Sequence, residues 1–289
     1  MSRDKTIRLD DRQIYEIKRL AVDTRHFLGV AHNVPIGNDI RLLLEKKDII
    51  LCEYPYPDVQ GTHTYGNITW VKTEAGDITF IGLNTSGYYD EQIFALAHEL
   101  YHYNTRTGRA YTLDTDSEDK LLEKKADRFA AELLLPRDAL DDAVIAFFDN
   151  SDVRKESDIR ILRFVAKLQC DWWLPFQSIV NRLLEEDKID KKQFDRLYDL
   201  DCRSEDGQYR RLLRSNDAEI AELLNKKTKT VGISGKVIET TINNYEDGYI
   251  DDDEFYKLMS LFGKKPQDYG FDFLVEIDDD IKFVIERGV

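Results

Sequence analysis

Two histidines and a glutamate lie close together in the run His98-Glu99-Leu100-Tyr101-His102. In a helix, side chains four positions apart lie on the same face, so the two imidazoles can share one metal ion. Imidazole nitrogen is a common zinc ligand. Glu99 would lie beside the ion, where its carboxylate can take a proton from water that the zinc activates. The spacing therefore predicts a zinc (Zn2+) site with His98 and His102 as ligands and Glu99 as the catalytic base.

The third protein ligand has to come from another element, because a catalytic zinc site uses three protein ligands and keeps one position open. The next predicted helix offers Glu123, with Asp127 one turn further along the same face. We expect Glu123 to bind the ion and Asp127 to hydrogen-bond a histidine ring nitrogen, which fixes the tautomer. The alternative is that both are solvent-exposed helix charges, since other charged residues surround them: Glu118, Asp119, Lys120, Lys124 and Lys125.

The elements that must position these residues are two helices and a strand hairpin. The helix with the histidines is predicted over 90–105, because apolar residues recur there at helical spacing. Residues 67–71 and 78–83 flank a turn at 74–77 and predict two antiparallel strands ahead of that helix. The helix with Glu123 is predicted from near Ser117 or Glu118 to Pro136.

The remaining segments complete an α+β pattern. Helices are predicted over 11–30 and 38–47 and a strand over 49–54, and from residue 137 onward the chain is almost entirely helical. The last predicted element is a hairpin over 271–289. We expect two domains, a zinc metallopeptidase domain over 1–150 and a mostly helical region over 151–289 that recognises a target or a regulator.

A family resemblance rests on two runs that occur in order, ALAHELYH at 95–102 and EKKADRFAAELLLP at 123–136. Together they resemble the ImmA/IrrE family of metallo-endopeptidases, over roughly residues 11–184. The resemblance implies a gluzincin-like core with a small antiparallel sheet and with Glu123 as the third zinc ligand. It also implies a role in cleaving or disabling transcriptional repressors of mobile elements or stress responses. Two residues depart from the family pattern, Tyr101 where glycine is common and Asp127 where asparagine is frequent, and we expect Tyr101 to pack away from the metal.

The composition is that of an acidic globular protein. Acidic residues outnumber basic ones 56 to 41 over 289 residues, for a formal charge of −15, which disfavours binding to nucleic-acid phosphates. Three widely spaced cysteines do not predict a disulfide framework. We see neither a signal peptide nor a run of membrane-spanning length and therefore expect a cytoplasmic protein.

Substrate-binding groups are predicted less sharply. The strand before the motif helix, Ile78 to Asn84, is a candidate for pairing with an extended peptide, or else an ordinary sheet member. Four side chains near the motif are chemically able to donate a hydrogen bond to a developing oxyanion, and spacing does not choose among them: His63, Tyr65, Tyr88 and Tyr89.

Two patterns in the second half have a structural and a functional interpretation. Residues 159–184 predict two helices joined by a turn, as in some DNA-binding units, but acidic residues follow at once and we favour helix packing. Residues 243–254 partly match a calcium-binding loop. Tyr245 occupies a ligand position, so an acidic turn between helices is favoured.

These features predict a zinc metallo-endopeptidase that hydrolyses a peptide bond in a protein target. The resemblance implies a helix-turn-helix transcriptional regulator as the partner. A second hypothesis is a non-catalytic, metal-containing regulatory protein that binds and sequesters a repressor or antitoxin partner. A third, a sequence-specific DNA binder, is disfavoured by the negative charge.

Overall fold

The computed structural model describes residues 8–57, 64–107 and 117–272. The chain divides into two units, Met1–Thr230 and Val231–Val289. The boundary expected at residue 150 therefore lies inside the first unit, so the helices that follow it belong to the same unit as the predicted metal site. A functional division at residue 150 stays a prediction.

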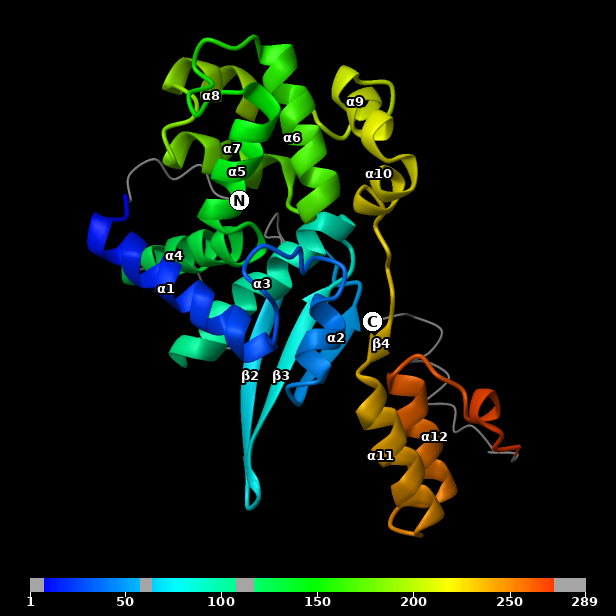
Figure 1. The fold of residues 1–289 in the computed structure, drawn as a ribbon. Coiled ribbons are helices and arrows are strands. Elements are labelled where there is room, and N and C mark those ends of the chain that lie inside the picture. Colours follow the sequence, from blue (N-terminus) through cyan, green and yellow to red (C-terminus); the bar gives the residue numbers. More distant parts are fainter. Residues whose placement is uncertain (1–7, 58–63, 108–116, 273–289) are drawn as a thin grey trace. The chain divides into compact units, whose positions relative to one another are not determined.

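The first unit is a mixture of helices and strands, as the α+β prediction requires (Figure 1). Its elements, in chain order, are α1 (Asp11–Leu28), α2 (Ile40–Glu45), β1 (Ile49–Tyr54), β2 (Gly66–Thr73), β3 (Gly76–Asn84), α3 (Tyr89–Thr105), α4 (Ser117–Leu134), α5 (Arg137–Phe148), α6 (Asp158–Trp172), α7 (Phe176–Glu185), α8 (Lys191–Tyr198), α9 (Gln208–Asn216) and α10 (Ala218–Leu224).

The sheet of the first unit is mixed, with β3 at its centre. β2 and β3 form the predicted antiparallel hairpin, in which Ile68 lies opposite Ile81. β1 pairs with the other side of β3 in parallel, with Leu51 opposite Ile81. The expectation of an antiparallel sheet was therefore wrong for β1. After β1 the chain runs to β2, on the far side of β3, and then returns as β3 between the other two strands. β3 therefore runs in the same direction as β1.

The sheet order also corrects the prediction that Ile78 to Asn84 accepts a substrate strand. Both edges of β3 are occupied, by β1 and by β2, so its backbone groups are not free to pair with a peptide. Among the strands that the structure describes in this unit, β2 lies at one edge of the sheet.

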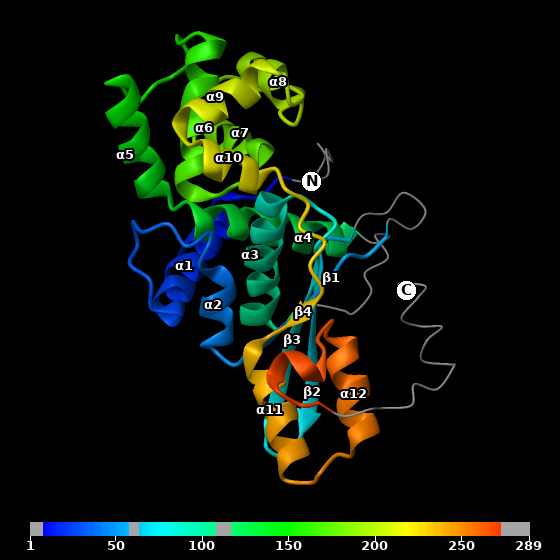
Figure 2. The ribbon, with the colours of Figure 1, turned by 90° about the vertical axis from the view of Figure 1, so that its right-hand side faces the viewer.

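The helix with the histidines, α3, packs against α4 and against strands β2 and β3 (Figure 2). Ile81 and Leu83, two positions apart on β3, and Ile68, opposite Ile81 on β2, are buried and point to the same face of the sheet. The metal-site helices are therefore fixed by one continuous apolar core.

A cluster of buried ion pairs joins α4 to α7. Arg182 is fully buried and lies 2.9 Å from Glu132 and 3.0 Å from Glu186. Arg128 also pairs with both carboxylates, at 3.0 and 2.6 Å. Since Arg182 was one of the few bases in the helix pair at 159–184, its burial supports the packing interpretation of that pair over a DNA-binding one.

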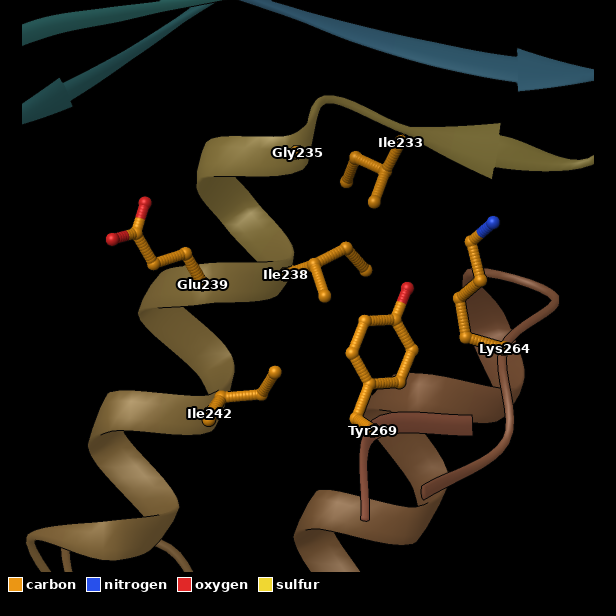
Figure 3. A pocket seen from close by; sticks show the side chains of 7 residues that line it. All are labelled: Ile233, Gly235, Ile238, Glu239, Ile242, Lys264 and Tyr269. Carbon is orange, nitrogen blue, oxygen red and sulfur yellow. The ribbon is translucent and has the colours of Figure 1, made fainter. Parts of the chain in front are cut away.

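The second unit comprises β4 (Gly232–Ile233), α11 (Gly235–Glu246), α12 (Asp252–Leu261) and a 3-10 turn η1 (Pro266–Tyr269). The predicted acidic turn joins α11 to α12, and Asp251 caps α12 by accepting a hydrogen bond from the Glu254 amide. A shallow pocket of about 350 Å³ lies between α11 and η1, where Ile238 and Ile242 face Tyr269 (Figure 3). The predicted hairpin at 271–289 lies almost wholly outside the described residues.

None of the helices that the structure describes combines the length and the apolar character needed to cross a membrane. The three cysteines, all within described segments, are free thiols.

Candidate metal centre

Helix α3 buries one side and presents the other to the site. Ile93, Leu96, Ala97 and Leu100 are completely buried, which fixes the rotation of the helix about its axis. His98 and His102 then lie one turn apart on the same side, as the four-residue spacing requires. His102 and Glu99 are themselves buried.

Helix α4 supplies the carboxylates. Its apolar side, with Ala126, Phe129 and Ala130, is completely buried. Glu123 and Asp127, one turn apart, are both partly exposed and lie next to the imidazoles of α3. The two are therefore more than solvated helix charges.

Potential ligand atoms of three residues converge between the two helices. Nε2 of His98 lies 3.1 Å from Oε2 of Glu123 and 3.2 Å from Nε2 of His102. Nε2 of His102 lies 3.6 Å from Oε1 of Glu123. Across the described segments, this is the one group of three or more histidine, cysteine or acidic side chains close enough to hold a metal ion.

The spacing of these atoms fits a tetrahedral zinc ion. Zinc bonds of about 2.0–2.1 Å place neighbouring ligand atoms of a tetrahedron about 3.3 Å apart. The 3.2 Å between the two imidazole nitrogens and the 3.1 Å from His98 to Oε2 of Glu123 are close to this spacing, and the other carboxylate oxygen, Oε1, lies 3.6 Å from His102. Two imidazoles with one glutamate are also a ligand set of catalytic zinc sites, which leave the fourth position open.

A second layer of contacts orients both rings. Oδ1 of Asp127 lies 3.1 Å from Nδ1 of His98, so the Nδ1 proton can be donated to this carboxylate while Nε2 faces the site. Nδ1 of His102 lies 3.4 Å from Oγ1 of Thr107. Such contacts fix the tautomer of a ligating histidine and raise its affinity for the metal.

The carboxylates of the site favour a positive charge between them. In the metal-free chain, burial lowers the pKa of His98, but hydrogen bonds to Asp127 and Glu123 outweigh burial and raise it well above its ordinary value. Burial, together with the neighbouring His98 charge, lowers the pKa of His102. Burial would raise the pKa of Glu123, yet the two histidines bring it below its ordinary value. A protonated His98 thus supplies the positive charge that the two carboxylates favour.

Glu99 is the most deeply buried carboxylate of the site. Burial raises its pKa to about 7, while the charge of His98 acts in the opposite direction. A carboxyl group that titrates near neutrality can accept a proton and release it again at the same pH. Glu99 therefore has the protonation behaviour that a general base requires.

Residues 44–167 match the family model for the IrrE N-terminal-like domain, a peptidase family. This part of the chain belongs to the ImmA/IrrE family. The matched range contains α3 and α4, and with them every residue of the candidate metal centre. A search of curated proteins found no match. The IrrE-like domain thus carries a metallopeptidase-type architecture, which confirms the resemblance predicted from the two sequence runs.

Other predicted residues lie in different places in the IrrE-like domain. Tyr101 packs its ring against Phe129, at 5.6 Å between centroids, on the side of α3 that faces the core. It touches only the edge of the His102 ring, at 5.7 Å, so it does not occupy the space between the ligands.

Two of the four oxyanion candidates lie away from the site. Tyr88 and Tyr89 lie at the beginning of α3, about 13 Å before His98 along the helix. The Tyr89 hydroxyl is bonded to Asn38, and the ring of Tyr88 is covered by Arg203. His63 lies outside the described residues. Tyr65 is partly exposed and directly precedes Gly66, the first residue of β2. Gly66 in turn lies against the Glu99 carboxylate.

Two contacts of the site were not predicted from the sequence. Gly66 lies against the Glu99 carboxylate, and Thr107 lies against His102. A glycine in a strand pattern is a signal for close approach of another group, so Gly66 could have been singled out. Thr107 lies two residues after the end of α3 and carries no such signal in the sequence.

Proposed function

We propose that the IrrE-like domain is a zinc-dependent metallo-endopeptidase, a hydrolase that cuts a peptide bond in a protein target. The observation that carries this proposal is the convergence of His98, His102 and Glu123, with ligand atoms 3.1 to 3.6 Å apart. The carboxylate of Glu99 stands next to them in sequence and has a pKa of about 7. A purely structural zinc site would not need this additional buried base.

The reaction is divided among the side chains in the following way. A bound zinc ion supplies a Lewis acid, which polarises a carbonyl group and lowers the pKa of water to near neutrality. Glu99 accepts a proton from the attacking water at a carboxylate oxygen and passes it to the amine nitrogen that leaves. Asp127 and Thr107 hold the imidazoles of His98 and His102 in one orientation throughout.

Strand β2 is the proposed place for the substrate backbone. It is the edge strand next to Glu99, so an extended peptide can add to it by main-chain hydrogen bonds. Tyr65, directly before this strand, is the remaining described candidate for donating a hydrogen bond to the oxyanion.

The target proposed is a helix-turn-helix transcriptional regulator of a mobile element or a stress response, met in the cytoplasm. This part of the proposal rests on the family likeness alone. The neighbouring genes offer a direct source of candidates.

A Glu99→Gln variant tests the proposed activity. It keeps the size of the side chain and the zinc ligands but removes the base, so cleavage of a candidate repressor should fall by roughly 10²- to 10⁴-fold, with bound zinc unchanged. Glu74→Gln, at the exposed hairpin turn, is the matched control. If Glu99→Gln disables the repressor as well as the wild type does, the chain acts by sequestering its partner and the peptidase proposal is wrong.

A further inference from the structure

Gly66 begins strand β2 opposite Leu83 of β3. Its φ lies outside the left-handed range, so its backbone conformation is open to any residue and does not itself require glycine. Glycine weakens a strand and in strands often marks a place where another group approaches closely. The reason for glycine here has to lie in the surroundings of its Cα atom.

The group that approaches Gly66 is the carboxylate of Glu99. A Cβ atom at position 66 would lie 3.1 Å from Oε1 and 3.3 Å from Cγ of Glu99, and 3.2 Å from the carbonyl oxygen of Gly82. Contacts this short require a neighbour to move by a few tenths of an ångström. The Glu99 carboxylate therefore uses space that any side chain at position 66 would enter.

The strand itself is held firmly, so it cannot give way. The buried Asn84 side chain donates a hydrogen bond to the carbonyl of Thr64 and accepts bonds from the amides of Tyr56 and Ser86. The main-chain N–H of Asn84 donates a hydrogen bond to the carbonyl of Tyr65, the residue before Gly66. The backbone is thus held by Asn84 before Gly66 and by the pairing of β2 with β3 after it, so the group that is free to move away from an added side chain is the end of the Glu99 side chain.

We propose that Gly66 is a positioning residue for Glu99: the absence of a side chain on β2 keeps the carboxylate beside the two histidines, where it can exchange a proton. This inference rests on the proposed peptidase function. Of the atoms that an added Cβ would meet, the Gly82 carbonyl oxygen belongs to the paired strand, whereas the nearest, Oε1, is the end of the Glu99 side chain. We therefore expect the adjustment to fall mainly on Glu99.

The test is Gly66→Ala in the full-length, zinc-loaded protein, with cleavage of a peptide substrate as the readout. The inference predicts that kcat falls at least 10-fold, with KM within 2-fold, zinc content unchanged and the melting temperature within a few degrees of the wild type. Glu74→Gln, at the exposed turn that follows β2 and outside the strand itself, should leave kcat and KM unchanged. A wild-type kcat for Gly66→Ala contradicts the inference.

A double-mutant cycle separates positioning from a general effect on the strand. In Glu99→Asp the carboxylate is one methylene shorter and withdraws from β2, so Gly66→Ala should lower kcat less in that background than in the wild type. Equal losses in the two backgrounds contradict a contact through Glu99.

Crystal structures of the wild type and Gly66→Ala test the inference independently of the proposed function, because they compare the position of the Glu99 carboxylate even if the wild-type protein cleaves no peptide. A displacement of the Glu99 carboxylate by 1 Å or more, with β2 in place, supports it. An unmoved carboxylate overturns it.

Discussion

Asp127 holds the imidazole of His98 through Nδ1, at 3.1 Å, and thereby directs Nε2 of the same ring toward Glu123. The two carboxylates lie one turn apart on α4, so a single helix face supplies both the predicted ligand and the residue that orients its neighbour. This relationship explains why an acidic pair on α4 and a histidine pair on α3 form one centre.

The orienting contact predicts a graded loss of metal affinity. Replacing Asp127 with alanine leaves Nδ1 of His98 without its acceptor. We expect the zinc dissociation constant to rise 10- to 100-fold, the usual effect of removing a residue that hydrogen-bonds a metal ligand. Competition with a chromophoric chelator measures the change. Asp119→Asn, two turns earlier on the same helix, should leave the constant unchanged; an unchanged constant in Asp127→Ala would show that the contact is not used.

Burial of Glu99 predicts a pH-dependent stability of the metal-free protein. Its pKa is about 7 in the folded chain, against an ordinary 4.5, so the folded state binds the proton more tightly than the unfolded state. The ionised group therefore costs stability progressively from pH 4.5 to pH 7, by roughly 3 kcal/mol at the upper end. In a chelator, Glu99→Gln should be more stable than the wild type at pH 8.

The same comparison at low pH completes this test. Near pH 4.5 the wild-type carboxyl is protonated and resembles the amide, so urea unfolding should show little difference between the two proteins. Glu74→Gln, at an exposed turn, should show no trend of this kind. If the difference in unfolding free energy between Glu99→Gln and the wild type were the same at every pH, a raised pKa of Glu99 in the folded state would be contradicted.

The buried ion pairs between α4 and α7 predict a large loss of stability on truncation. Arg182→Ala removes a fully buried guanidinium and leaves Glu132 and Glu186 less well paired. We expect a loss of roughly 3–5 kcal/mol in the free energy of unfolding. Lys167→Ala, which breaks an exposed pair with Asp171, should cost less than about 1 kcal/mol. Similar losses in both variants would contradict the role of burial.

Much of the fold was predictable because local patterns determine local elements. The alternation of apolar residues and the turn at 74–77 predicted the β2–β3 hairpin, and the spacing of Ile93, Leu96 and Leu100 predicted α3. The parallel pairing of β1 with β3 was not predictable in this way, because it depends on where a connecting segment crosses the sheet. The strand-addition hypothesis for β3 was wrong for the same reason.

The sequence predicted the metal centre as far as it predicted which residues share one face of each helix. The four-residue spacing aligned His98 with His102, and the same spacing aligned Glu123 with Asp127. The contacts of Gly66 with Glu99 and of Thr107 with His102 join segments whose approach is set by tertiary packing. A glycine in a strand can signal a close approach, but no local pattern tells which distant group approaches.

The central claim is that His98, His102 and Glu123 together hold one zinc ion, and elemental analysis of the purified full-length protein tests it most directly. We predict one zinc per chain in the wild type, and almost none in His102→Ala or Glu123→Ala, with wild-type occupancy in the nearby control Lys120→Ala. A wild-type protein without stoichiometric zinc, or zinc retained in both ligand variants, would contradict the account.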